Sequence, residues 1–219
     1  MRHPSQWLFG GIAGVISVCA YIVAVAVPWP ENQLGTSGLL VVVSLFPLLG
    51  IVYSYGLYSF VAAERESAVN RLGLVFAITA STTLLAMLIV QLAVNAGVAE
   101  ITRDLDAVSA RALRRGLRMI DLGLDVAWDF LIGTALLLSG LAMRRRSGLG
   151  RGWAIPSIGF GIALIGLNAA TFPWPPATRG LFDIGPFIAV FMLALAARLA
   201  LLGRRETRSL SALSPDTSR

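Results

Sequence analysis

Apolar residues are gathered into six long blocks in this chain of 219 residues, at about 7–28, 38–62, 72–98, 122–143, 153–172 and 181–202. A helix of roughly 20 residues crosses a hydrocarbon core of about 30 Å, and every block reaches that length. Short segments with Pro, Gly and charged residues separate the blocks. The pattern predicts an all-α polytopic membrane protein, in which residues 1–202 form a bundle of six transmembrane helices.

Small residues occur in these blocks at spacings that let membrane helices pack closely. Gly10 and Gly14 stand four residues apart in the first block, and Ser157, Gly159 and Gly161 form a small-residue face in the fifth. Helix association in a membrane depends on such close packing, because lipid tails are as apolar as the side chains. We expect these residues to lie at helix contacts.

Composition excludes several classes of protein. The chain is 56% hydrophobic and only 14% charged, whereas a soluble domain carries about 25% charged residues. The single Cys19 excludes a disulfide scaffold, and with one His3 the chain lacks the ligands of a His/Cys zinc site. No phosphate-binding loop, metalloprotease motif or serine-hydrolase motif is present. We therefore expect no cofactor, and no sequence motif indicates an enzyme.

The net charge of +6 comes from eighteen basic residues, all of them Arg, which cluster at the ends of the apolar blocks. Arg at block ends is typical of contacts with lipid headgroups and of topology signals, not of nucleic-acid binding. A cytoplasmic N-terminus places more Arg in the cytoplasmic segments than in the outer loops. We therefore predict a multi-pass protein of a bacterial inner (plasma) membrane with both termini in the cytoplasm, the lipid bilayer being its first partner.

Two polar segments flank the last three blocks. The loop at about 99–121 has apolar residues at helical spacing and Arg on another face, which predicts an amphipathic interfacial helix between spans three and four. The segment 203–219 is rich in Ser, Thr and Arg. It is expected to be a disordered cytoplasmic tail.

The spans also differ in polarity with depth. At about 1.5 Å of rise per residue, polar side chains of five spans fall about 5–9 Å beneath the outer edge of the core. These are Tyr21, Ser44, Gln91, Asp129 and Asn168. Asp183 lies near the outer interface, before the last span. The inner half carries hydroxyl groups but neither carboxylate nor amide, so the costly polar groups are concentrated toward the outside.

Asp129 is the most expensive of these groups, since a central Asp costs about 2.5–3.5 kcal/mol on insertion scales. It forms a stripe with Asp121 and Asp125, spaced every fourth residue. Two interpretations are open. Asp129 is a structural partner of Asn168 and Gln91, or the layer is the floor of an outward-facing pocket.

In the second interpretation the protein binds a small cationic or protonatable ligand, as a sensor, a carrier or an accessory subunit. Asp129 supplies the charge, and Asn168, Gln91 and Tyr21 supply orienting hydrogen bonds. Asp125 and Asp183 line the entrance. In the first interpretation the chain is a structural subunit, and its partner is a membrane complex or a second copy of itself.

The residues Asp106, Ala110, Arg111, Asp125 and Asp129 resemble the signature of the CDP-alcohol phosphotransferases in their spacing. That resemblance implies a lipid-headgroup transferase in which Asp106, Asp125 and Asp129 bind divalent metal ions. The chain departs from the signature at three places, with Arg103 for the first Asp, Ala107 for the first Gly and Asp121 for the second Gly.

The C-terminal half also resembles small, uncharacterised six-span bacterial membrane proteins. The matching segments are 124–130, 168–173 and 183–186. No activity is implied by this resemblance, but the segments include Asp125, Asp129, Asn168 and Asp183, which the depth argument selects independently.

Overall fold

The computed structural model describes residues 3–26, 31–64, 66–144 and 148–213. Within these ranges the chain forms long helices and no strand. The elements are α1 (Pro4–Ala26), α2 (Glu31–Ala62), α3 (Ala68–Ile101), α4 (Ala107–Met143), α5 (Gly150–Thr171), the short 3-10 helix η1 (Pro176–Arg179) and α6 (Gly185–Leu213). Six helices in the described ranges are long and apolar enough to cross a membrane. The predicted all-α, six-helix membrane architecture is confirmed.

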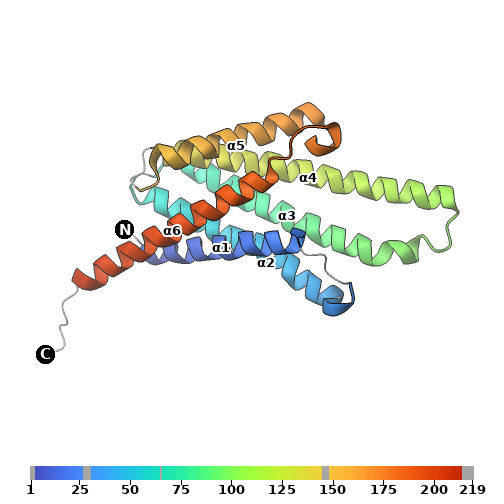
Figure 1. Cartoon of the computed structure of the whole chain (residues 1–219), viewed down its shortest axis with the longest axis horizontal. Helices are drawn as coiled ribbons and strands as arrows, with labels where there is room; N and C mark the ends of the chain where they lie inside the picture. Colours follow the sequence, from blue (N-terminus) through green and yellow to red (C-terminus); the bar gives the residue numbers. More distant parts are fainter. Residues whose placement is uncertain (1–2, 27–30, 65, 145–147, 214–219) are drawn as a thin grey trace.

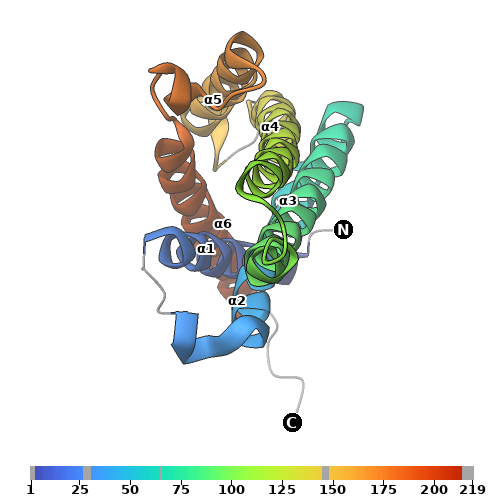
Figure 2. The same cartoon turned by 90° about the vertical axis from the view of Figure 1, so that its right-hand side faces the viewer.

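The helices form a continuous series in which each packs on its neighbour (Figures 1 and 2). α1 lies between α2 and α6, α2 packs on α3, and α4 lies between α3 and α5. Large apolar side chains on the outer surface are exposed, among them Val41, Ile162 and Val190. Such a surface is suited to contact with lipid tails.

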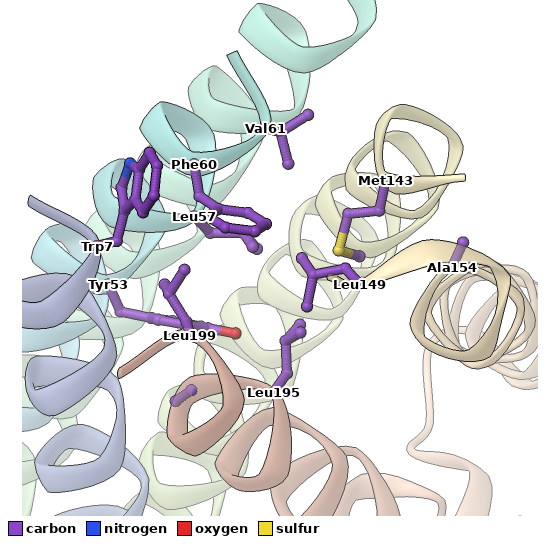
Figure 3. Packing of buried hydrophobic residues seen from close by; sticks show 11 residues of the cluster. Trp7, Tyr53, Leu57, Phe60, Val61, Met143, Leu149, Ala154, Leu195 and Leu199 are labelled. Atoms are coloured by element: carbon purple, nitrogen blue, oxygen red, sulfur yellow. The ribbon is translucent and has the colours of Figure 1, made fainter. Parts of the chain in front are cut away.

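The main core lies near the N-terminal end of α1. Side chains of Trp7 on α1, Phe60 on α2, Met143 on α4 and Leu199 on α6 converge there (Figure 3). Towards the other end, α6 packs on α5 through Phe191, whose ring centroid is 5.4 Å from that of Phe160. The large rings of Phe160 and Phe191 hold the backbones of α5 and α6 apart. The backbones of the other neighbouring helices approach each other more closely.

Glycine permits the closest of these approaches. A Cβ at Gly10 would lie 2.6 Å from the Cα of Gly56, so α1 and α2 touch backbone to backbone. A Cβ at Gly161 would lie 2.5 Å from the carbonyl oxygen of Gly133, so α5 approaches α4 in the same way. The predicted role of these small residues in close packing is confirmed for Gly10, Gly14 and Gly161. It is not confirmed for Gly159, where an added Cβ would meet no atom of another helix within 4 Å.

The interfacial helix predicted within residues 99–121 was wrong. α3 continues to Ile101, and α4 starts at Ala107 and runs unbroken to Met143. The amphipathic spacing is therefore that of the first turns of α4. Residues 107–121 contain no Pro, and Gly116 is the one Gly among them. The sequence therefore has no signal that ends the helix before the apolar block begins. The α3–α4 hairpin extends beyond the other helices (Figure 1).

α6 is also longer than the sequence predicts, because it continues through Gly203 to Leu213. A Cβ at Gly203 would lie 2.5 Å from the backbone nitrogen of Leu8. This glycine therefore serves close packing against α1 and does not end the helix. The rest of the predicted tail, 214–219, lies outside the described residues.

The two glycines of α5 provide a matched test of close packing. We expect Gly161→Ala to destabilise the protein by about 1–3 kcal/mol, because its methyl group meets the α4 backbone. Gly159→Ala should be neutral, since open space surrounds that position. Thermal unfolding in detergent measures both. Equal melting temperatures for the two variants would contradict this account of the α4–α5 contact.

Candidate functional site

The antiparallel contact of α4 and α5 brings Asp129 and Asn168 together. Asn168 Nδ2 donates to Asp129 Oδ2 at 2.8 Å. Farther along the same contact, Ser157 Oγ donates to the carbonyl oxygen of Leu136 at 2.7 Å. The Gly133–Gly161 approach lies between these two hydrogen bonds. Close backbones at this point let a short Asn side chain span the gap to the carboxylate.

Asn168 is almost completely buried, with 1% of its surface exposed. Its Nδ2 also donates to the carbonyl oxygen of Leu164 at 3.0 Å. Its Oδ1, in contrast, accepts no hydrogen bond from any described residue. A buried acceptor without a donor costs about 1–3 kcal/mol. The amide therefore holds Asp129 and presents an unused acceptor beside it.

Two further carboxylates lie near Asp129. Asp125 is one turn away on the same helix, and Asp183 comes from the connection between α5 and α6. All three interact electrostatically with one another. Asp183 Oδ1 also accepts from the backbone nitrogen of Gly185 at 2.8 Å, at the start of α6. We call Asp125, Asp129 and Asp183 the acidic cluster.

Tyr21 lies near the C-terminal end of α1. It is close enough to all three carboxylates to interact with them electrostatically. Its ring centroid is 5.3 Å from that of Phe46, and Trp128 packs on the same apolar group. Depth along the span selects Tyr21 in the sequence, and its hydroxyl makes no hydrogen bond to the carboxylates among the described residues.

Gln91 does not join this group, contrary to the sequence interpretation. Its Nε2 donates to Asp121 Oδ1 at 2.6 Å, about 12 Å along α4 from Asp129 at 1.5 Å per residue. The register of α3 against α4 explains the difference, because Gly73 lies against Ser139 and fixes which residues are opposite each other. Counting residues from the end of an apolar block gives the depth of a side chain in the membrane. It does not give the register of one helix against its neighbour.

The alternative metal site is also wrong. Asp106 precedes α4 and caps it, accepting from the backbone nitrogens of Val108 and Ser109. The Ser109 hydroxyl and these backbone donors hold the pKa of Asp106 below its usual value. The unbroken helix places it about 28 Å from Asp125 at 1.5 Å per residue. Asp106 therefore cannot share an ion with Asp125 and Asp129, and no described group of three His, Cys, Asp or Glu could hold a metal.

A second polar feature, a cavity of about 40 Å³, lies in the other half of the bundle. Its polar lining includes Tyr53, Asn70, Ser139 and Ser157. The hydroxyl of Tyr53 is buried and has no hydrogen-bond partner among the described residues. The sequence shows that the inner half contains hydroxyl groups. It does not show that they line one cavity, because that depends on how several helices pack.

Comparison with known proteins found no family model that matches the chain, no similar curated protein and no similar solved structure.

The Asp129–Asn168 hydrogen bond predicts unequal effects of two substitutions. Asn168→Ala leaves the carboxylate without its donor, and we expect a loss of about 0.5–2 kcal/mol. Asp129→Asn should cost less, because its amide can donate to Asn168 Oδ1. Thr171→Val is the control, since that hydroxyl bonds only within α5. Unfolding in detergent measures all three, and an Asn168→Ala protein as stable as the control would argue against the bond.

Proposed function

We propose that this membrane protein binds a small cationic or protonatable ligand at the acidic cluster. The observation that carries the proposal is the buried Asn168 amide, which holds Asp129 and leaves its Oδ1 without a donor. A primary or secondary ammonium group supplies the charge that neutralises a carboxylate. Its N–H groups also suit the unpartnered amide oxygen, which they reach once the side chains covering that buried atom move aside.

The charge balance of the cluster supports this proposal. Among the described residues, no Arg forms an ion pair with Asp125, Asp129 or Asp183. Carboxylates in membrane helices persist where they find a partner or water. A bound cation removes the repulsion among the three groups.

Aromatic side chains beside the cluster support the same ligand class. Tyr21 and Trp128 pack on the apolar group of Phe46, Leu84 and Met87 and are only half-buried, and Tyr21 lies within electrostatic range of the three carboxylates. An aromatic face attracts a cation within about 6 Å of its centroid. An organic ammonium ion therefore finds carboxylates on one side and rings on the other.

We place the acidic cluster on the outer side of a bacterial inner membrane, with both termini in the cytoplasm. This assignment rests on the excess of Arg at the opposite end of the bundle. The protein then samples ligands from outside the cell, as a sensor, a carrier or an accessory subunit.

Ligand binding is tested by the thermal stability of the purified full chain at constant ionic strength. The probes are sodium, potassium, calcium, methylammonium and tetramethylammonium chloride. A cation that binds the folded state raises the melting temperature, by an amount equivalent to about 2.7 kcal/mol at 100 times its Kd. We expect Asp129→Asn to abolish this rise. Asp104→Asn, an equal change of charge outside the cluster, should preserve it, and identical responses of both variants would refute the site.

Accessibility of the site is tested in intact cells. Cys19→Ser removes the native thiol, and Asp129→Cys in that background places one thiol at the cluster. We expect a membrane-impermeant thiol reagent to label it from outside, because Asp183 of the cluster is exposed and the proposed orientation places that end of the bundle outside the cell. Labelling only from the cytoplasm would reverse the orientation. Absence of labelling from both sides would leave Asp129 a purely structural residue.

A further inference from the structure

The projecting part of the α3–α4 hairpin contains a groove of about 550 Å³. We call it the hairpin groove. Its walls are one face of α3 and one face of α4, and its lining residues are Val90, Gln91, Val94, Asn95, Val98, Ala99, Arg114, Leu117, Arg118 and Asp121. The Gln91–Asp121 hydrogen bond closes its lower end, and Arg114 Nη2 donates to Thr102 Oγ1 at 3.2 Å near its upper end.

The two walls differ in chemistry. The α3 wall carries Val90, Val94 and Val98, which recur every fourth residue and form one apolar stripe. The α4 wall carries Arg114 and Arg118, also four residues apart. Both guanidinium groups are exposed, and no ion pair to either one occurs among the described residues. The groove thus combines two cations available to an anion with an apolar surface beside them.

The depth of the hairpin groove matches the polar layer of a bilayer. The apolar part of α4, 122–143, has a length of about 33 Å and fills the hydrocarbon core. Arg118 then lies about 6 Å outside the core and Arg114 about 12 Å outside, at 1.5 Å per residue. Headgroups occupy roughly the first 5–8 Å beyond the core on each side. Arg118 is therefore level with lipid phosphates, and Val90 is level with the beginning of the acyl chains.

We propose that the hairpin groove binds one anionic phospholipid. Arg118 contacts its phosphate, and Arg114 and the amide of Asn95 contact the polar headgroup beyond the phosphate. The glycerol backbone passes Val94, and an acyl chain enters the membrane beside Val90. Guanidinium groups suit phosphate because they donate several N–H groups in one plane. The apolar stripe distinguishes a lipid from a free phosphate, which would leave the valines uncovered. This site shares no residue with the acidic cluster, so either proposal can fail without the other.

The test uses the full chain in a mild detergent and native mass spectrometry with added phosphatidylglycerol. We expect wild-type protein to retain one lipid molecule. Arg114→Gln with Arg118→Gln should weaken retention about tenfold or more, because the contacts with the phosphate and with the headgroup are both lost. The matched control is Arg111→Gln with Arg115→Gln, which removes equal charge from the same helix but outside the groove. That variant should change retention less than twofold.

Two additional measurements separate a lipid site from other causes. Val94→Trp fills the groove without changing its charge, so we expect it to weaken retention as well. Thr102→Val removes the hydrogen bond from Arg114 and the one that the Thr102 hydroxyl donates to the Val98 carbonyl oxygen. It leaves both Arg side chains in place and should leave retention intact, with unchanged helix content by circular dichroism. Glycerol 3-phosphate should not displace the lipid at equal concentration. Equal losses in both Arg pairs, full retention by Val94→Trp, or displacement by glycerol 3-phosphate would each overturn the proposal.

Discussion

The close approach of α4 and α5 at Gly133 and Gly161 is the constraint on which the candidate site depends. In a membrane there is little hydrophobic gain from bringing two apolar helices together, so contact distance decides whether they associate. At this contact the missing side chain of Gly161 lets backbone meet backbone. The short side chains of Asn168 and Ser157 can then reach the partner helix. A larger residue at position 161 would move both hydrogen bonds out of range.

Along α4, basic side chains come first and acidic side chains follow. Its projecting turns hold Arg114 and Arg118, and its membrane part begins with Asp121 and Asp125 before reaching Asp129. Gln91 takes the first carboxylate, Asp121, as a hydrogen-bond partner and thereby separates the basic surface from the acidic cluster. An anion and a cation can therefore be held on one helix without neutralising each other. This separation is a consequence of the unbroken length of α4.

Much of this fold could be predicted from the sequence, because helix length and apolar composition are local properties. The pairing of Asp129 with Asn168 was also within reach, since α4 and α5 are joined by a short connection from which residues can be counted along both helices. Gln91 was placed wrongly because the register of α3 depends on the contact of Gly73 with Ser139. The start of α4 was misplaced because the polarity of its first turns suggested a loop boundary. Polarity changes where a helix meets water, but only a cap or a breaker ends it.

The contrast between the two halves of the bundle indicates where a ligand is needed. In the inner half Ser157 is satisfied by a backbone carbonyl. The Tyr53 hydroxyl lies beside a cavity of about 40 Å³, which is large enough for a water molecule. A water molecule would suffice there, because the lining of that cavity carries only neutral groups. In the acidic cluster water can donate to Asn168 Oδ1, but it cannot neutralise Asp125, Asp129 and Asp183. Only a proton or a cation removes their repulsion, and this difference is the physical reason for proposing a cation site at this end of the bundle and none at the other.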